Sequence, residues 1–300
     1  MSAIPRPTRG VPEAVRPARD ARRAARRGAI YLVLIVMAGL FLVPLYVVVA
    51  GSLKSFEEVS TSSIWDFPSQ PSLEAFSDSL QPPLINSGGI ASGLRNSLAM
   101  TIPAVILSAI WGSVTGYALS MWRFRGSELL FALILFGLFI PYQAILIPLL
   151  TTLQLLRLFD SLAGLALTHV VFGLPITTLI FRNFYAAIPG ELLDAARVDG
   201  AGFWQVFLRI VLPLSVPAFV VVGIWQFTSI WNEFLFAVSL TSSPATQPVT
   251  VSLQNLAGSF AAQYNVQLAG ALIAAVPTLL VYVLLGRYFV RGLLAGSLKG

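Results

Sequence analysis

Six long apolar stretches constrain what this chain can fold into more than any other feature of its sequence. A helix needs about 20 mostly apolar residues to cross the hydrocarbon core of a bilayer. Stretches of that length occupy residues 29–50, 97–121, 129–153, 162–181, 210–231 and 266–286. We therefore predict an all-α, polytopic membrane protein with six transmembrane helices.

Composition excludes a water-soluble domain. Of the residues, 56% are hydrophobic and 11% are charged, whereas a soluble globular protein has about 25% charged residues. The chain has no cysteine and one histidine, which excludes a disulfide framework and a thiolate metal site. We expect no metal or other cofactor to bind this chain.

The distribution of lysine and arginine predicts the orientation, because cytoplasmic loops of membrane proteins carry an excess of these residues. With the N-terminus inside, 16 of the 19 fall in cytoplasmic segments, and the outer segments hold Lys54, Arg95 and Arg157. Both termini are then cytoplasmic. We expect residues 1–28 to be a disordered, basic cytoplasmic tail against anionic membrane lipid, and 29–300 to be one six-helix domain. Because most of the positive charge lies in the predicted cytoplasmic segments, topology explains the net charge of +6. We therefore expect no nucleic-acid partner.

Two patterns inside the spans concern helix packing. Small side chains recur every fourth residue at Ser108, Gly112 and Gly116, which allows another helix to approach closely, either within this chain or from a second subunit. Prolines, each of which tends to kink a helix, occur in or at the ends of most spans: Pro44, Pro103, Pro141, Pro148, Pro175, Pro213, Pro217 and Pro277. So many breaks favour a transporter over a simple membrane anchor.

The most informative stretch is the predicted cytoplasmic segment 188–213, between the fourth and fifth spans. Pro189 and Gly190 break the preceding helix, and Glu191 opens a new helix where its charge meets the positive end of the helix dipole. Gly200 is placed to end this helix in a left-handed conformation. The pattern predicts a short helix with a sharp exit.

Side-chain spacing in this segment predicts two faces. The first helix carries small residues on the face formed by Leu192, Ala195, Ala196 and Asp199. A second amphipathic piece carries an apolar stripe formed by Phe203, Phe207 and Ile210. A rigid helix of this kind, held between two spans, suits docking to a partner.

The same residues resemble the EAA motif of binding-protein-dependent ABC importer permeases. The resemblance rests on Asp194-Ala195-Ala196, Asp199-Gly200-Ala201, Phe207, Ile210, Leu212 and Pro213. Asp194 departs from the motif, because it replaces a glutamate and reaches one methylene less far. Further similar stretches are Arg95-Asn96-Ser97-Leu98, Trp231-Asn232-Glu233-Phe234 and the C-terminal residues 287–300, which look like the tail of the carbohydrate-type, maltose-permease-like branch.

The resemblance implies a permease subunit of a sugar importer in a bacterial cytoplasmic (inner) membrane. It implies three partners: a second permease subunit that completes a heterodimer, a dimer of ABC ATPase that holds ATP and Mg, and an extracytoplasmic sugar-binding protein. The segment would be the coupling helix that docks on the ATPase through Glu191, Asp194, Ala195, Ala196, Asp199, Gly200, Ala201, Phe203 and Phe207. Because this chain lacks a phosphate-binding loop motif, we expect it to be no enzyme.

A polar cluster ends the fifth span: Gln226, Ser229, Trp231, Asn232 and Glu233. An aromatic ring among hydrogen-bonding groups suits a polyhydroxylated ligand, so these residues are candidates for the sugar pathway. The alternative is an interfacial anchor with solvated neighbours.

The predicted outer loop 240–263 carries no charged residue. The family resemblance implies that this loop reaches into the binding protein and helps to displace the sugar. Its polar, uncharged candidates for that contact are Gln254, Asn255, Ser259 and Gln263.

The main alternative function is an ion-coupled secondary transporter. Such proteins bind the coupling ion through charged groups inside the membrane, and Glu233 is the one acid near a span interior in this sequence. A membrane enzyme is disfavoured because no catalytic motif is present. His169, in the fourth span, is interpreted as a hydrogen-bonded packing residue or as a proton relay.

Overall fold

The computed structural model describes residues 16–81, 89–122, 124–257 and 263–297, and every regular element within these ranges is helical. The predicted all-α class is confirmed. In chain order the elements are α1 (Arg16–Ser52), α2 (Phe56–Thr61), α3 (Glu74–Leu80), α4 (Gly89–Met121), α5 (Ser127–Phe136), η2 (Gly137–Phe139), η3 (Tyr142–Ile145), α6 (Leu146–Leu155), α7 (Leu162–Tyr185), α8 (Gly190–Val198), α9 (Phe203–Val206), the π-helical η4 (Phe207–Val211), α10 (Leu212–Leu214), α11 (Val216–Trp231), α12 (Leu235–Leu240), α13 (Val249–Ala257) and α14 (Tyr264–Ser297).

Four of the described helices are long and apolar enough to cross a membrane, namely α1, α4, α7 and α14. Two bent helix pairs complete six spans if each pair counts as one. The first pair, Ser127–Phe139 and Tyr142–Leu155, is bent by 92°, and the second, Phe203–Leu214 and Val216–Trp231, is bent by 74°.

The predicted spans 129–153 and 210–231 are therefore not continuous helices. Pro141 lies at the first break, and Pro213 and Pro217 flank the second. Proline lacks the N–H group that an uninterrupted helix needs, and its ring clashes with the preceding turn. Neighbouring helices can satisfy the freed backbone groups at membrane depth.

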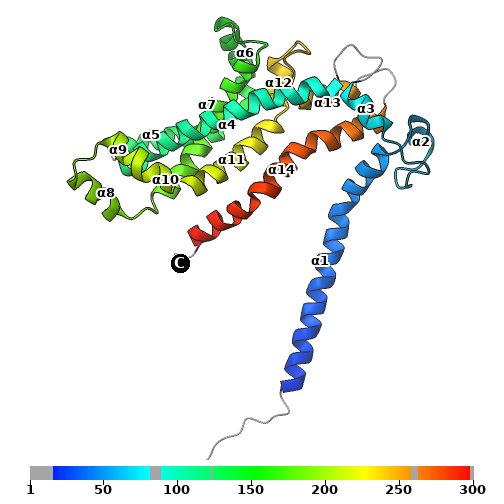
Figure 1. Ribbon diagram of the computed structural model, residues 1–300, viewed down its shortest axis with the longest axis horizontal. Coiled ribbons are helices and arrows are strands. Elements are labelled where there is room, and N and C mark those ends of the chain that lie inside the picture. The colour runs from blue at the N-terminus through cyan, green and yellow to red at the C-terminus, as the bar shows by residue number, and fades with distance from the viewer. Residues whose placement is uncertain (1–15, 82–88, 123, 258–262, 298–300) are drawn as a thin grey trace, which may run out of the picture.

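Close packing of α4 against α7 forms the centre of the molecule, and α11 packs on both (Figure 1). A Cβ atom at Gly112 would overlap the side chain of Thr177, and one at Gly116 would lie 2.8 Å from the Cβ of Phe181. The two glycines thus let the helix backbones approach. Of the two interpretations of this small-residue stripe, the structure shows packing within the chain.

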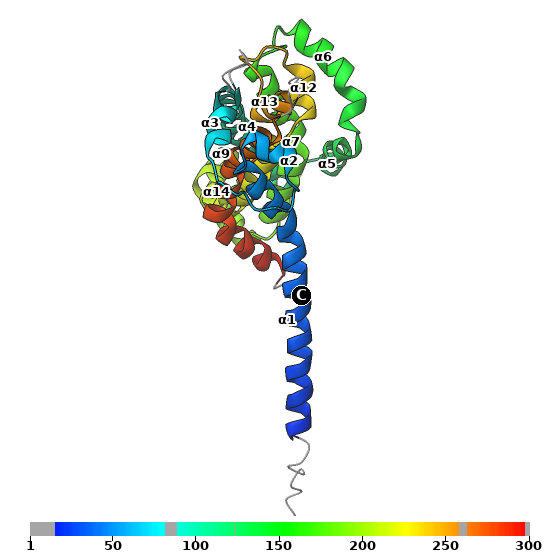
Figure 2. The ribbon, with the colours of Figure 1, turned by 90° about the vertical axis from the view of Figure 1, so that its right-hand side faces the viewer.

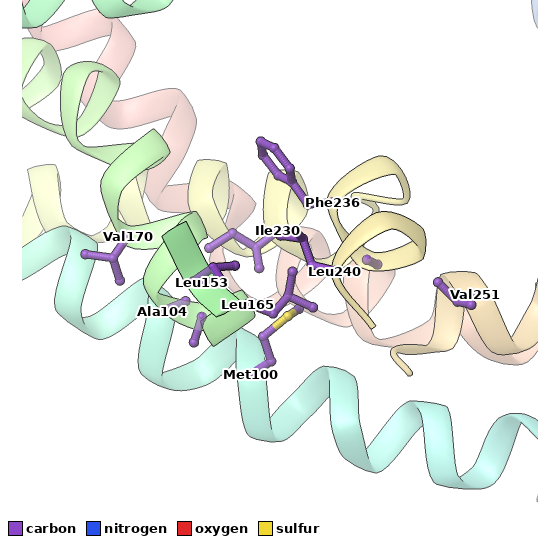
Figure 3. Close-up of a cluster of buried hydrophobic side chains, with 11 residues drawn as sticks. Met100, Ala104, Leu153, Leu165, Val170, Ile230, Phe236, Leu240 and Val251 are labelled. Carbon is purple, nitrogen blue, oxygen red and sulfur yellow. The ribbon is translucent and has the colours of Figure 1, made fainter. Parts of the chain in front are cut away.

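Two buried clusters lie along these helices. One joins α4, α6, α7, α11, α12 and α13 (Figure 3) and includes Met100, Leu153, Leu165, Ile230 and Phe236. The other joins the opposite ends of α4, α7 and α11 to α8 and α9 and includes Tyr117, Phe181, Leu193, Phe207 and Val222. As a result, α8 and α9 lie at one end of the bundle, and α6, α12 and α13 lie at the other (Figure 1).

Helix α1 stands apart from the bundle (Figures 1 and 2) and meets α14 near its own C-terminal end. Its apolar side chains from Ile30 to Tyr46 are exposed. The helix begins at Arg16, so residues 16–28 are helical where we had expected a disordered tail. Residues 1–15 of that tail lie outside the described ranges.

The α4–α7 contact predicts a difference between two glycine substitutions. Gly112→Ala should be less stable than Gly223→Ala by about 1–3 kcal/mol, the usual cost of overpacking. A Cβ at Gly223, in the middle of α11, would meet no atom within 4 Å, and both alanines bring the same gain in helix propensity. Thermal unfolding of the purified protein in detergent measures this difference, and equal unfolding temperatures would contradict it.

Candidate functional site

Helix α8 has the predicted start and stop signals. Pro189 occupies the N-cap position, Glu191 lies in the first turn, and Gly200 follows the helix with φ at +76°. Two backbone bonds close the end of the helix: Gly200 N donates to the carbonyl of Arg197 at 3.0 Å, and Ala201 N donates to that of Ala196 at 2.9 Å. A residue with positive φ at this place turns the chain sharply toward α9.

The exposed face of α8 differs from the predicted one. Leu193 and Ala196 are buried against the bundle, while Leu192 and Ala195 are exposed. Ala195 and Ala196 therefore do not share one open face, because burying Leu193 turns Ala196 inward with it. The other predicted coupling residues that are exposed are Glu191, Asp194, Asp199 and Gly200.

The apolar stripe after Gly200 holds the segment on α4. The ring centroid of Tyr117 lies 4.7 Å from that of Phe203 and 5.1 Å from that of Phe207, and Trp122 meets Phe203 edge-to-face at 5.3 Å. Phe207 is buried, and Phe203 and Ala201 are half-buried. These three predicted coupling residues pack within the chain and thereby position α8.

Arg197 also fixes α8, and the sequence patterns did not single it out. Its Nη2 donates to the carbonyl of Met121, the last residue of α4, at 3.2 Å. Its Nη1 lies 3.3 Å from Asp194 Oδ1, and its guanidinium carbon lies 5.9 Å from the ring centroid of Trp122. The available signal was a basic residue in the last turn of a short helix, where it can satisfy carbonyl groups.

In the polar cluster at the end of α11, Trp231 does not offer its ring for stacking. Its side chain is 2% exposed, its Nε1 donates to the carbonyl of Ala274 at 2.9 Å, and its ring stacks on Phe227 at 5.5 Å. The structure thus assigns Trp231 to packing within the chain. We correct the expectation that this ring contacts a sugar.

Gln226 is buried as well, and its Nε2 has no hydrogen-bond partner among the described residues. A Cβ at Gly173 would overlap this amide, so Gln226 fills the space that Gly173 leaves on α7. Ser229 and Asn232 are exposed. Of the five candidates, these two are open to a ligand in this conformation.

Glu233 serves the backbone of the next helix. Both of its carboxylate oxygens accept from Phe236 N at 2.9 Å, and one also accepts from Ala237 N at 3.2 Å. A carboxylate at the N-terminus of α12 satisfies N–H groups that have no partner within the helix. This use of Glu233 gives no support to a coupling-ion site.

The stretch 240–263, which we predicted to be an outer loop, is not simply a loop, because α13 occupies part of it. Gln254 and Asn255 are exposed on α13, and Asn255 Nδ2 donates to Gln247 Oε1 at 2.9 Å. Gln263 is half-buried beside a cavity of about 160 Å³. Ser259 lies outside the described residues.

In the part of the chain that the structure describes, His169 and the acidic residues form no metal site. Among the residues that the structure describes, no group of three or more His, Asp or Glu side chains could hold a metal ion. His169 is 6% exposed, and its ring packs edge-to-face on Phe236 at 5.8 Å. The ring therefore packs within the chain, as one of the two interpretations holds, but its Nε2 has no hydrogen-bond partner among the described residues.

Residues 104–294, which include α8, α9 and the α11 cluster, match the family described as "Binding-protein-dependent transport system inner membrane component". The chain belongs to this family. It is 43% identical, over 93% of its length and 99% of the relative's, to a probable ABC transporter permease protein of Pyrococcus horikoshii. It is 36% identical to a xylose/arabinose import permease protein of Haloferax volcanii, over 89% of this chain and 92% of the relative.

Solved structures confirm the permease fold. A chain in the crystal structure of a bacterial ABC transporter for import of the acidic polysaccharide alginate has a TM-score of 0.74. It is 23% identical, with 89% of this chain and 98% of that chain covered. The family membership identifies a multi-pass, non-enzymatic membrane subunit and disfavours the secondary-transporter alternative.

Asp160 is a structural residue of this permease that the sequence patterns missed. It lies in the turn before α7 with φ at +53°. One carboxylate oxygen accepts from Ser242 N at 2.9 Å, from Ser243 N at 3.1 Å and from Thr246 Oγ1 at 2.5 Å. Burial raises the pKa of Asp160, but these three hydrogen bonds lower it by more, so the pKa lies below its usual value. The carboxylate thus ties the segment before α13 to the α6–α7 turn.

Asp160→Ala should therefore loosen the stretch 241–248. We expect faster hydrogen exchange at the amides of Ser242 and Ser243, because both lose their acceptor. The pKa of Asp160 is lower in the folded protein than in the unfolded chain. At a pH above the unfolded-state pKa, the ionised carboxylate therefore stabilises this stretch fully. This stabilisation is lost as the pH falls through the folded-state pKa. Exchange mass spectrometry at neutral pH is the measurement. Unchanged exchange in both amides would contradict the assignment.

Proposed function

We propose that this permease is a membrane subunit of an ABC importer that carries a sugar and couples its passage to ATP hydrolysis on a separate ATPase. The observation that carries the proposal is the segment α8–Gly200–α9 at one end of the helix bundle. It is tied to α4 by the hydrogen bonds of Tyr117 and Arg197, and it lies within the family match. Its exposed side chains include three acidic ones beside apolar ones: Glu191, Asp194, Asp199, Leu192 and Val198. A seated, rigid element is what force transmission between subunits requires.

The proposed partners follow from this arrangement. A dimer of ABC ATPase, carrying ATP and Mg, would dock on the exposed face of α8 through Glu191, Asp194, Ala195 and Asp199. The exposed apolar surface of α1 leaves room for bilayer lipid and for a second permease subunit. An extracytoplasmic sugar-binding protein would meet the opposite end of the bundle at α13, where Gln254 and Asn255 are exposed. One structural relative was solved in complex with an alginate-bound periplasmic protein, which supports this partner class.

A sugar is the substrate class that the relatives' names support. They include import permeases for xylose and arabinose, for glucose and for alpha-glucosides. In this chain, Ser229 and Asn232 offer neutral hydrogen-bonding groups at the outer end of α11, and neutral groups match hydroxyls at a lower desolvation cost than charges. We propose these two residues as this subunit's contribution to the sugar pathway.

The proposed orientation places both termini in the cytoplasm. Reporter fusions at Ser77, which lies on α3, and at Arg197, which lies on α8, should then report opposite sides of the membrane. The expectation rests on the excess of lysine and arginine in cytoplasmic loops. A periplasmic signal at Arg197 would overturn the proposed docking of the ATPase there, because ATP is cytoplasmic.

Gly200 provides the sharpest test of coupling. Gly200→Val should lower sugar uptake while the protein still inserts in the membrane, because a β-branched residue with φ at +76° costs roughly 1 kcal/mol or more. A side chain there meets no atom within 4 Å, so the cost lies in the backbone alone. The measurement is uptake together with ATP hydrolysis in the reconstituted transporter.

Two controls distinguish the backbone strain at Gly200 from the effect of adding an exposed side chain to this segment. Gly202→Val introduces the same side chain two residues away, where φ is −78° and a Cβ would also meet no atom within 4 Å, and it should retain uptake. Gly200→Asn should lie between, because asparagine tolerates positive φ better than valine. Wild-type uptake and coupled hydrolysis in Gly200→Val would show that α8–Gly200–α9 is an ordinary loop.

A further inference from the structure

Helix α4 contacts both of the segments proposed to meet partner proteins, one near each of its ends. At one end, Tyr117 Oη donates to the carbonyl of Phe203 at 3.2 Å. Arg197 Nη2 donates to the carbonyl of Met121 at 3.2 Å. Tyr117 is 1% exposed and Phe203 is half-buried, so the contact with α9 is partly buried.

At its other end, α4 contacts the segment that contains α13. Asn96 Nδ2 donates to the carbonyls of Ala245 at 2.9 Å and Gln247 at 3.0 Å. The backbone N–H of Val249 donates to Ser97 Oγ at 2.9 Å. The backbones also approach closely, because a Cβ at Gly93 would lie 2.9 Å from the Cα of Val249.

The two sets of contacts lie on one uninterrupted helix. Asn96 and Tyr117 are separated by about 20 residues, or roughly 30 Å at 1.5 Å per residue, which matches the thickness of the hydrocarbon core. Packing on α7 at Gly112 and Gly116 supports α4 between them. Both sets bond side chains of α4 or α8 to backbone groups, so each fixes the position of a whole segment.

The covalent routes out of the α8–α9 segment are less direct. Toward α11 the chain bends by 74° at Ser215. Toward α7 it passes through a turn between Tyr185 and Pro189. α4 belongs to neither covalent connection, and it still contacts α8 and α9 at one end and the α13 segment at the other.

We propose that α4 transmits movement between the ATPase-facing segment and the α13 segment, with Tyr117 and Asn96 as positioning residues at its two ends. This inference rests on the proposed function, because that function assigns a partner to each segment. Coupling of this kind works in both directions, so ATP binding on one side alters the exposure of α13 on the other.

The experiment uses the assembled transporter in membranes, with its ATPase and second permease. Because the chain has no cysteine, Gln254→Cys places a single thiol on the exposed surface of α13. The rate at which a maleimide labels this thiol is measured with and without the probe AMP-PNP plus Mg²⁺. We expect the probe to change the rate by about fivefold or more, the lower range of common coupling effects.

Two variants break the contacts of α4 one end at a time. Tyr117→Phe keeps the ring and removes the hydroxyl that bonds to Phe203, and Asn96→Leu keeps the size and removes the amide donors. Each should abolish most of the response to AMP-PNP, and the double variant should lose no more than the larger single loss. Tyr46→Phe is the matched control, because its hydroxyl bonds to the carbonyl of Trp65 away from α4; it should keep the full response.

The outcomes separate this inference from the proposed function. A full response to AMP-PNP in both Tyr117→Phe and Asn96→Leu would overturn the role of α4. So would a double variant whose response is clearly smaller than that of the weaker single variant. Both results would leave the proposed function intact. A wild-type background without any response would also overturn the role of α4. Failure of an ABC ATPase to co-purify with the wild-type permease would overturn the proposed function, and the inference with it.

Discussion

The rest of the structure depends on the close approach of α4 to α7. Gly112 and Gly116 lack the Cβ atoms that would collide with Thr177 and Phe181, so the two backbones pack in direct contact. In a bilayer, where lipid tails are as apolar as the side chains, such close packing replaces the hydrophobic effect as the force between helices. The paired helices then provide the surface on which α8, α9, α11 and α13 are held. The positions of both proposed docking segments follow from this one contact.

Much of the fold could be predicted from the sequence, because length and apolarity suffice to identify a membrane span. The sequence also predicted α8 and the positive φ of Gly200, since proline, an acidic first turn and a terminal glycine act locally. The two broken spans, 129–153 and 210–231, were predicted as continuous helices. Proline was recognised as a kink-former there, but whether a helix bends or stays continuous depends on its neighbours: Pro103 and Pro175 lie inside unbroken helices, and Pro141 lies at a break.

The candidate sites were harder to predict, because exposure is a property of the whole fold. Sequence spacing grouped Ala195 with Ala196, and only the bundle decides that Ala196 faces inward and Ala195 outward. The sequence suggested that Trp231 offers its ring to a sugar, whereas in the structure the ring is buried and stacks on Phe227. Asp160 and Arg197 were missed for the same reason, since their partners lie 82 and 76 residues away along the chain. A local pattern can mark a residue such as Arg197, in the last turn of its helix, but it does not identify a partner so far away along the chain.

The most direct test of the central claim is cross-linking from single cysteines in the assembled transporter. Ala195→Cys and Gln254→Cys, each carrying a benzophenone maleimide, place the probe on the exposed faces of α8 and α13. We expect illumination to join the α8 probe to the ABC ATPase, and we expect the α13 probe to react with the binding protein and not with the ATPase. Cross-links to the ATPase from α13, or none from α8 in a complex that retains its ATPase, would contradict the account.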